Sequence, residues 1–162
     1  MFNLQVTAQV KKNVQDINNR NLDIKPGNIH LTDANANKFL GSWKWKDNTR
    51  HFTLILKKSL HQYGSIEKPA AMELIKGYYI YNNGVNEVNT INDSTVTGST
   101  EGEINTAYLL ISDKKANKVI EFKIISVNPN TVKFELSPRN KEGYDHRNTL
   151  NLPANILLTK VN

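Results

Sequence analysis

The side chains best suited to acid–base catalysis or metal binding are scarce and scattered in this sequence. The four histidines are His30, His51, His61 and His146. No two of them are separated by the one or three residues typical of a zinc site. Asp145 directly precedes His146, but neighbouring side chains in an extended segment point to opposite sides. We therefore expect neither a metal centre nor an acid–histidine dyad.

The remaining candidates for catalysis are carboxylates and serines. Glu101 and Glu103 could face the same way, as the paired carboxylates of a glycoside hydrolase do. They lie in a segment rich in Ser, Thr and Gly, where solvated side chains are the simpler interpretation. No serine occurs in a Gly-x-Ser-x-Gly motif, and there is no glycine-rich phosphate loop. The sequence predicts no catalytic residue, no metal and no cofactor, and a protein that is not an enzyme.

Length and composition indicate one folded domain. The chain has 162 residues, of which 38% are hydrophobic and 22% charged, enough to bury a core. It has no cysteine, which excludes disulfides, thiolate metal sites and cysteine nucleophiles. No apolar run approaches the roughly 18 residues of a membrane-spanning helix, so no transmembrane segment is expected.

The positive net charge of +6 does not by itself indicate a nucleic-acid partner. Residues 71–105 carry one basic residue against five acidic ones, so the charge is unevenly distributed. Many basic residues fall where predicted strands should face water: Lys44, Lys46, Lys57, Lys123 and Lys133. No helix-turn-helix, zinc-finger or RNA-recognition motif is present. We expect a solvated basic surface and no nucleic acid.

From residue 40 onward, segments rich in β-branched and aromatic residues alternate with turn signals. The predicted strands are residues 40–46, 51–58, 72–81, 85–91, 106–112, 119–127, 131–136 and 156–161. A further weak strand is predicted near residues 95–97, and residues 59–70 are predicted to be a looser link. A short helical turn over residues 34–39 precedes the first strand, with Thr32 or Asp33 as its N-cap and Gly41 at its end.

Eight strands with mostly short connections can form a two-sheet sandwich or an up-and-down barrel. Closure removes exposed strand edges, so the predicted fold is all-β, an eight-stranded antiparallel up-and-down barrel with a short helical turn before the first strand. The predicted barrel domain spans residues 39–162. Residues 1–38 are predicted to be a signal-peptide remnant followed by an extended polar leader.

The assignment of that leader depends on Val6-Thr7-Ala8, which resembles a signal-peptidase site. The basic and apolar stretches of a complete signal peptide are not present before it. Either Met1 is an internal methionine of a longer precursor, or the likeness is accidental. The first interpretation predicts export to the periplasm or the extracellular space, with a mature chain that begins near Gln9.

Strand alternation indicates which side chains share the barrel interior. If Trp43 points inward, so does the side chain two residues later. The candidate lumen residues are Trp45, Phe52, Leu54, Leu56, Phe122 and Phe134. They either fill the barrel completely or line a pocket for a small, mostly apolar molecule. Both faces of residues 72–81 carry large side chains, so the orientation of Tyr78, Tyr79 and Tyr81 is left open.

Residues Phe39-Leu40-Gly41-Ser42-Trp43 resemble the opening signature of lipocalins and their calycin relatives. This resemblance implies a barrel whose closed end is plugged by Trp43. It also implies a basic side chain from the last strand packed on that indole. Lys160 occupies the corresponding place, where the family usually has arginine. The resemblance therefore marks Gly41, Trp43 and Lys160 as the fold signature.

The sequence also resembles uncharacterised small exported proteins of Gram-negative bacteria. The shared motifs are a Gly-x-Trp-Lys-Trp opening at Gly41 and a second segment that runs from Ile75 to Gly84. The likeness implies export and a barrel but no activity. We expect an exported lipocalin-like barrel that binds a small, mostly apolar ligand. The alternative is a protein-interaction module, an inhibitor or a surface-assembly component, with a filled barrel. The oligomeric state is not indicated.

Overall fold

The structure, a computed structural model, describes residues 13–16, 29–65, 69–91, 95–113, 118–136, 151–153 and 155–161. The described elements are β1 (Asn13–Asp16), β2 (Ile29–Thr32), the 3₁₀ helix η1 (Asn35–Phe39), β3 (Gly41–Lys46), β4 (His51–Gly64), β5 (Pro69–Asn82), β6 (Glu87–Asn89), β7 (Val96–Ser99), β8 (Thr106–Asp113), β9 (Lys118–Asn128), β10 (Thr131–Leu136) and β11 (Ile156–Val161). In the described part of the chain, no helix is long and apolar enough to cross a membrane.

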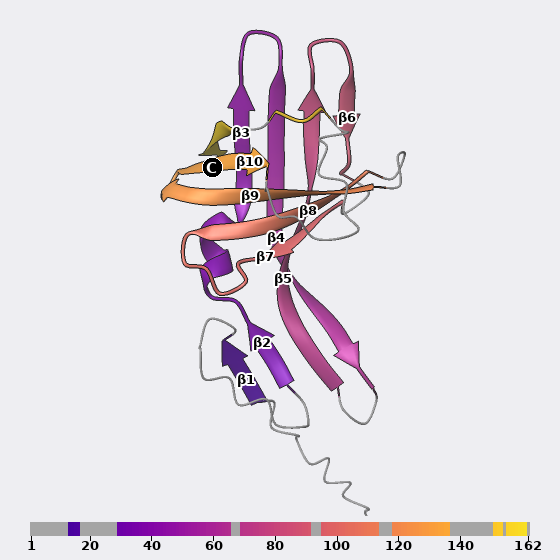
Figure 1. The fold of residues 1–162 in the computed structure, drawn as a ribbon, viewed down its shortest axis with the longest axis vertical. Coiled ribbons are helices and arrows are strands. Elements are labelled where there is room, and N and C mark those ends of the chain that lie inside the picture. The colour runs from indigo at the N-terminus through magenta and orange to yellow at the C-terminus, as the bar shows by residue number, and fades with distance from the viewer. Residues whose placement is uncertain are drawn as a thin grey trace, which may run out of the picture.

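Eight of these strands close into a ring (Figure 1). The order around the ring is β3, β4, β5, β7, β8, β9, β10 and β11, and every neighbouring pair is antiparallel. The ring closes where β11 pairs with β3 and Lys160 lies opposite Trp43. The predicted eight-stranded up-and-down barrel, with a helical turn before its first strand, is confirmed.

One strand of the ring differs from the prediction. The segment predicted as a strand over residues 85–91 contributes only β6, which pairs with the end of β5 outside the ring. The ring position belongs to β7, which lies where a weak extra strand was predicted. Val96 of β7 is fully buried, whereas all three residues of β6 are exposed. Burial against the core therefore selects β7.

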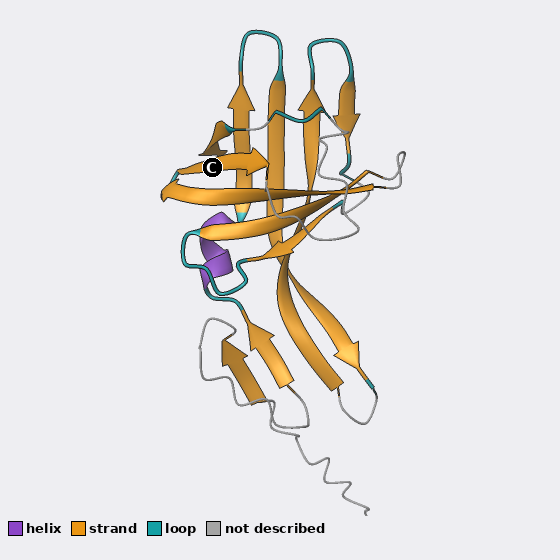
Figure 2. Ribbon diagram, viewed as in Figure 1, coloured by secondary structure: helices purple, strands orange, loops and turns teal. Residues whose placement is uncertain are grey.

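The β4–β5 hairpin is longer than predicted, because residues 59–64 and 69–70 continue the strands rather than forming a loose link. Its lower part extends beyond the ring as an arm (Figure 2). On the free edge of β5, β2 pairs with residues 70–72 in parallel, and β1 pairs with β2. Part of the range predicted as an extended leader is therefore paired into this sheet.

Inward-facing side chains of the ring form the core, as period-two alternation requires. The largest fully buried side chains are Trp43, Tyr79, Phe39, Phe52, Phe122, Phe134, Leu54, Leu56, Ile75, Leu109, Ile111 and Ile120. The Trp43 indole N–H donates to the Phe39 carbonyl oxygen at 2.7 Å. This bond joins η1 to the first barrel strand at the end from which the arm extends.

A buried polar cluster, which we call the floor network, separates the core from the arm. The Asp33 carboxylate, 1% exposed, accepts hydrogen bonds from the Ala36 N–H at 3.2 Å and from the Thr100 N–H at 3.1 Å. It also accepts from the Thr100 hydroxyl at 2.9 Å. Asp33 thus ties the first turn of η1 to the loop after β7. The N-cap residue of η1 is Ala34, so the predicted N-cap at Thr32 or Asp33 is wrong.

The same network reaches the hairpin through Glu73. Its Oε2 accepts from the Asp33 N–H at 3.1 Å and from the Lys58 ammonium at 2.9 Å. Burial acts to raise the pKa of Glu73, but the hydrogen bonds from Lys58 and from the Asp33 backbone outweigh it and hold the pKa below its usual 4.5. The carboxylate is therefore the stable form at neutral pH.

The close pairing of β5 with β4 depends on Gly77, which also pairs with β7. A Cβ at this position would overlap the backbone oxygen of Ile55. We expect Gly77→Ala to lower the free energy of unfolding by about 3 kcal/mol, because the strands must separate to accept the methyl group. Urea denaturation measures the change. Gly102→Ala is the control: it meets no atom within 4 Å and should cost only about 1 kcal/mol, for its positive φ. Equal losses would contradict the close-approach explanation.

The lowered pKa of Glu73 predicts a pH dependence of stability. A carboxylate whose pKa is lower in the folded state stabilises that state above the unfolded pKa, and this contribution disappears as the pH falls through the folded pKa. Stability should therefore fall from about pH 5 towards pH 3, and Glu73→Gln should reduce that fall. Thermal melting across this pH range tests it, with Glu103→Gln, an exposed carboxylate of the neighbouring loop, as control. If both variants keep the wild-type slope, Glu73 does not contribute.

Candidate functional site

Five of the six predicted lumen residues meet inside the ring as a packed cluster. Phe52, Leu54, Leu56, Phe122 and Phe134 are each at most 1% exposed. The ring centroids of Phe122 and Phe134 are 4.7 Å apart, and those of Phe52 and Phe134 are 5.1 Å apart. At these distances aromatic rings are in direct contact. The residues are brought together as predicted, and they occupy the lumen with their own side chains.

The sixth predicted residue, Trp45, lies half-buried near the β3–β4 turn. The guanidinium of Arg50 sits 5.3 Å from the centre of its ring, within cation–π range. Arg50 is held by Asp47 through a hydrogen bond of 2.8 Å from Nε. That bond lowers the pKa of Asp47 and raises that of Arg50. A cation therefore lies over the face of Trp45.

The three signature residues are in mutual contact. The Lys160 ammonium lies 5.2 Å from the centre of the Trp43 ring, the basic-residue packing that the lipocalin resemblance implied. Gly41 has φ +118°, and an added Cβ would lie 3.1 Å from Cε of Lys160. Glycine thus leaves room for the lysine side chain to lie across the indole.

The three tyrosines of β5 divide between its faces. Tyr79 and Tyr81 are 1% and 5% exposed inside the ring, where their centroids lie 6.1 and 6.3 Å from that of Phe52. Tyr78 directly precedes Tyr79 on the strand and so faces outward. The structure thereby assigns the orientation of the three tyrosines, which the sequence left open.

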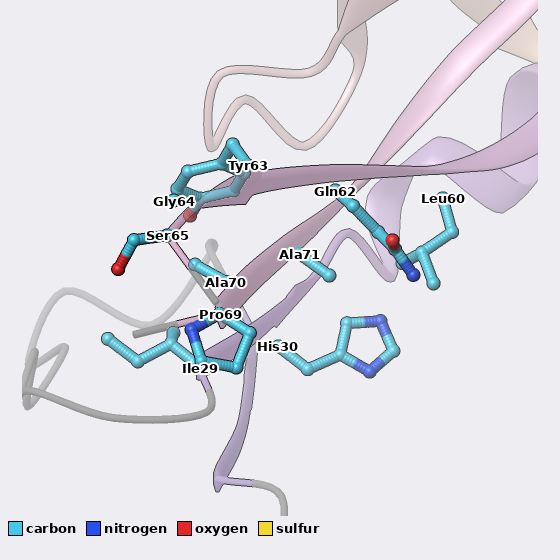
Figure 3. Close-up of a pocket in the computed structure, with 10 residues that line it drawn as sticks. All are labelled: Ile29, His30, Leu60, Gln62, Tyr63, Gly64, Ser65, Pro69, Ala70 and Ala71. Carbon is cyan, nitrogen blue, oxygen red and sulfur yellow. The ribbon is translucent and has the colours of Figure 1, made fainter. Parts of the chain in front are cut away.

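A pocket of about 370 Å³ lies on the arm, outside the barrel lumen (Figure 3). Its lining comes from β2, β4 and β5 and the residue after β4. The lining residues are Ile29, His30, Leu60, Gln62, Tyr63, Gly64, Ser65, Pro69, Ala70 and Ala71. The floor network lies between this pocket and the aromatic cluster. Lys58 and Glu73 share a face of the hairpin with Gln62 and Ala71 of the pocket and lie nearer to the barrel.

Strand register explains why there is a hollow at this position. Ala71 of the central strand lies opposite Gln62 on one side and His30 on the other. Opposite residues in a sheet share a face, so the three side chains point the same way. Two strand spacings place Gln62 and His30 about 10 Å apart. The short side chain of Ala71 leaves the space between them open.

His30 supplies the unusual polar atom of the pocket. Its Nε2 is buried, and within the described part of the chain it has no hydrogen-bond partner. Buried polar atoms are nearly always hydrogen-bonded, so each exception needs an explanation. An imidazole nitrogen can donate or accept, according to the tautomer. Together with the amide of Gln62, it gives an apolar hollow two hydrogen-bonding groups.

The pocket was not predicted, because residues 59–70 were expected to form a loose link. Its formation needs the pairing of β2 with residues 70–72 of β5. The sequence assigned β2 to a leader, and residues 70–72 lie where the predicted loose link meets the predicted strand 72–81. The residues considered for catalysis do not join it. Glu101 and Glu103 are exposed after β7, while Asp145 and His146 lie outside the described residues. Among the described side chains, no three acidic or histidine residues converge as a metal site would require.

Comparison with known proteins gives a family without an activity. Residues 1–110 match the family described as a family of unknown function, DUF6705. The matched stretch contains β2, β4 and β5, so it includes every residue that lines the pocket. No curated protein and no solved structure matches the chain. Since the match covers more than half of its length, the chain belongs to this family of unknown function.

Proposed function

We propose that this protein binds a small, mostly apolar molecule, and that the ligand occupies the arm pocket rather than the barrel lumen. The observation that carries the proposal is a hollow of about 370 Å³ lined by His30, whose buried Nε2 has no hydrogen-bond partner among the described residues. Small-molecule sites usually have volumes of roughly 300–1,000 Å³ and combine apolar walls with a few polar groups. The arm pocket has both properties.

The packing of the lumen supports this location. Phe52, Phe122 and Phe134 are in ring-to-ring contact and fully buried. A ligand in their place would have to displace side chains that already satisfy one another, at a cost of several kcal/mol for each large aromatic residue moved. A ligand in the arm pocket displaces only solvent, because the walls of the hollow are already held by the β2–β5–β4 register.

The polar groups indicate the chemistry of the ligand. His30 and Gln62 flank an apolar floor made by Ala71, with Leu60 beside Gln62. A compact molecule with an apolar body and one or two hydrogen-bonding groups would satisfy His30 Nε2 and contact that floor. The proposal is for binding without catalysis.

Lipocalin-like character and export are further parts of the proposal. The contact between Lys160 and Trp43, next to Gly41, supports the first. The Val6-Thr7-Ala8 sequence supports the second. A protein-interaction module remains the second candidate function. The packed lumen favours it, because such a barrel serves as a rigid scaffold rather than a container.

Filling the pocket should abolish ligand binding. N-phenyl-1-naphthylamine, a neutral apolar fluorophore, should bind the wild-type protein saturably. Ala71→Phe should weaken that binding at least about tenfold, because the new ring occupies the space between Gln62 and His30. Thr53→Phe, which adds the same ring to the outer face of β4, is the matched control and should bind like the wild type. Fluorescence titration measures both.

Unchanged affinity in Ala71→Phe would overturn the pocket assignment. Native mass spectrometry of protein purified from its own host then distinguishes the two functions. A co-purifying small molecule that Ala71→Phe loses supports the ligand-binding proposal. A co-purifying protein that Ala71→Phe retains supports the interaction module instead.

A further inference from the structure

The outer face of the barrel at β3, β4 and β5 carries four lysines that we call the lysine face: Lys44, Lys46, Lys57 and Lys76. Each occupies an outward position, because the inward positions of these strands hold core residues such as Trp43, Leu56 and Ile75. Lys44, Lys46 and Lys57 are exposed, and Lys76 is half-buried. The feature lies away from the arm pocket and is independent of the proposed function.

Two of these lysines face each other directly. Lys57 and Lys76 are partners in the register of β4 and β5, so their side chains leave the same face side by side. Like charges in directly opposite positions destabilise a sheet. The Lys57–Lys76 pair is therefore locally destabilising, and locally destabilising arrangements are expected at functional sites.

Lysines elsewhere on the same barrel are neutralised by acids. Lys123 and Lys133 both contact the Glu135 carboxylate at 2.6 Å, and Lys58 contacts Glu73 at 2.9 Å. No described acidic side chain forms an ion pair with a member of the lysine face. The contrast shows that positive charge is concentrated on β3–β5 while it is balanced on β9 and β10.

The four charges form two pairs with an aromatic ring between them. Lys44 and Lys46 lie two residues apart on β3. Lys44 is opposite Thr53, which is four residues from Lys57 and hence about 13 Å along the sheet. The intervening row holds Tyr78 opposite Ile55, and Ile55 opposite Ser42. Tyr78 is half-buried and faces outward.

We propose that the lysine face binds a linear acidic polysaccharide, whose sulfate or carboxylate groups pair with the two lysine pairs while a sugar ring packs on Tyr78. Lysines present mobile point charges that suit spaced anionic groups. A tyrosine offers an apolar face with a polar end, which suits the surface of a sugar. Single-stranded nucleic acids are held by several aromatic side chains that stack successive bases, and this face has one.

The experiment compares two double variants of equal net charge. Lys57→Gln with Lys76→Gln removes the facing pair, and Lys123→Gln with Lys133→Gln removes two lysines held by Glu135. Heparin and polygalacturonic acid serve as the sulfated and carboxylated probes. At about 0.1 M salt, the first variant should bind its better probe about tenfold more weakly than the wild type, as expected for two lost charge contacts. The second variant should bind within about twofold of the wild type.

Tyr78→Ala tests the contribution of the aromatic ring to binding separately from that of the charges. It should weaken binding several-fold while leaving the slope of log affinity against log salt unaltered, because the slope counts charge contacts. Melting curves verify that each variant is folded. Ala71→Phe should bind the polysaccharide normally, so this inference and the pocket proposal succeed or fail separately.

Three results would overturn the inference. One is equal binding by the two double variants, which would show a response to net charge only. Another is the absence of measurable affinity for either polysaccharide at 0.1 M salt. The third is tighter binding, lost with Lys57 and Lys76, to an oligothymidylate or to phosphatidylglycerol vesicles, which would assign the face to another class of partner.

Discussion

The pairing along the outer edge of β5 is the constraint on which the rest of the structure depends. Three segments share that edge in succession: β2 at residues 70–72, β7 at residues 75–77 and β6 at residues 80–82. Only the middle pairing closes the ring, and it is three residue pairs long. Gly77 and Gly98 both take part in this pairing, and each also lies close to the strand on its other side. A Cβ on Gly77 would overlap the carbonyl oxygen of Ile55 in β4, and one on Gly98 would overlap that of Tyr108 in β8. The barrel, the arm and the pocket all depend on which of these three segments pairs with each part of β5.

The sequence predicted the ring well wherever local alternation reflects burial. Phe52, Leu54 and Leu56 share one face of β4, which packs on the core, while Thr53 and Lys57 lie on the other face, and this period-two pattern can be read from the sequence. The exchange of β6 for β7 could not be predicted in this way. Residues 85–91 contain more apolar side chains, yet Val85 is 86% exposed, whereas Val96 is fully buried. A short Thr-Gly-Ser segment becomes a barrel strand only through its long-range pairing with Ile75 and its neighbours.

The pocket lay beyond prediction for the same physical reason. His30, Ala71 and Gln62 are brought together by one parallel and one antiparallel pairing between segments far apart in sequence. Neither segment has a strong local signal, so no pattern within a short window could place them on one face. Three members of the lysine face, Lys44, Lys46 and Lys57, were predicted from alternation to face water, whereas Lys76 was not. What the sequence could not show was which of them have an acidic neighbour, because that depends on Glu135 lying beside Lys123 and Lys133 in the folded sheet.

The floor network gives the β4–β5 hairpin two regimes of tolerance to substitution. Above Lys58 and Glu73, each inward position is limited by volume, because its neighbours are side chains in contact on every side. Below them, the same face of the two strands is open to solvent. Substitutions there are limited by solvation and by the hydrogen-bonding groups of the pocket, not by side-chain volume. The change occurs between two neighbouring same-face pairs of one continuous ladder, Lys58 with Ile75 and Leu60 with Glu73. Substitutions in the arm can therefore change which ligand the pocket binds while the packing of the barrel interior stays the same.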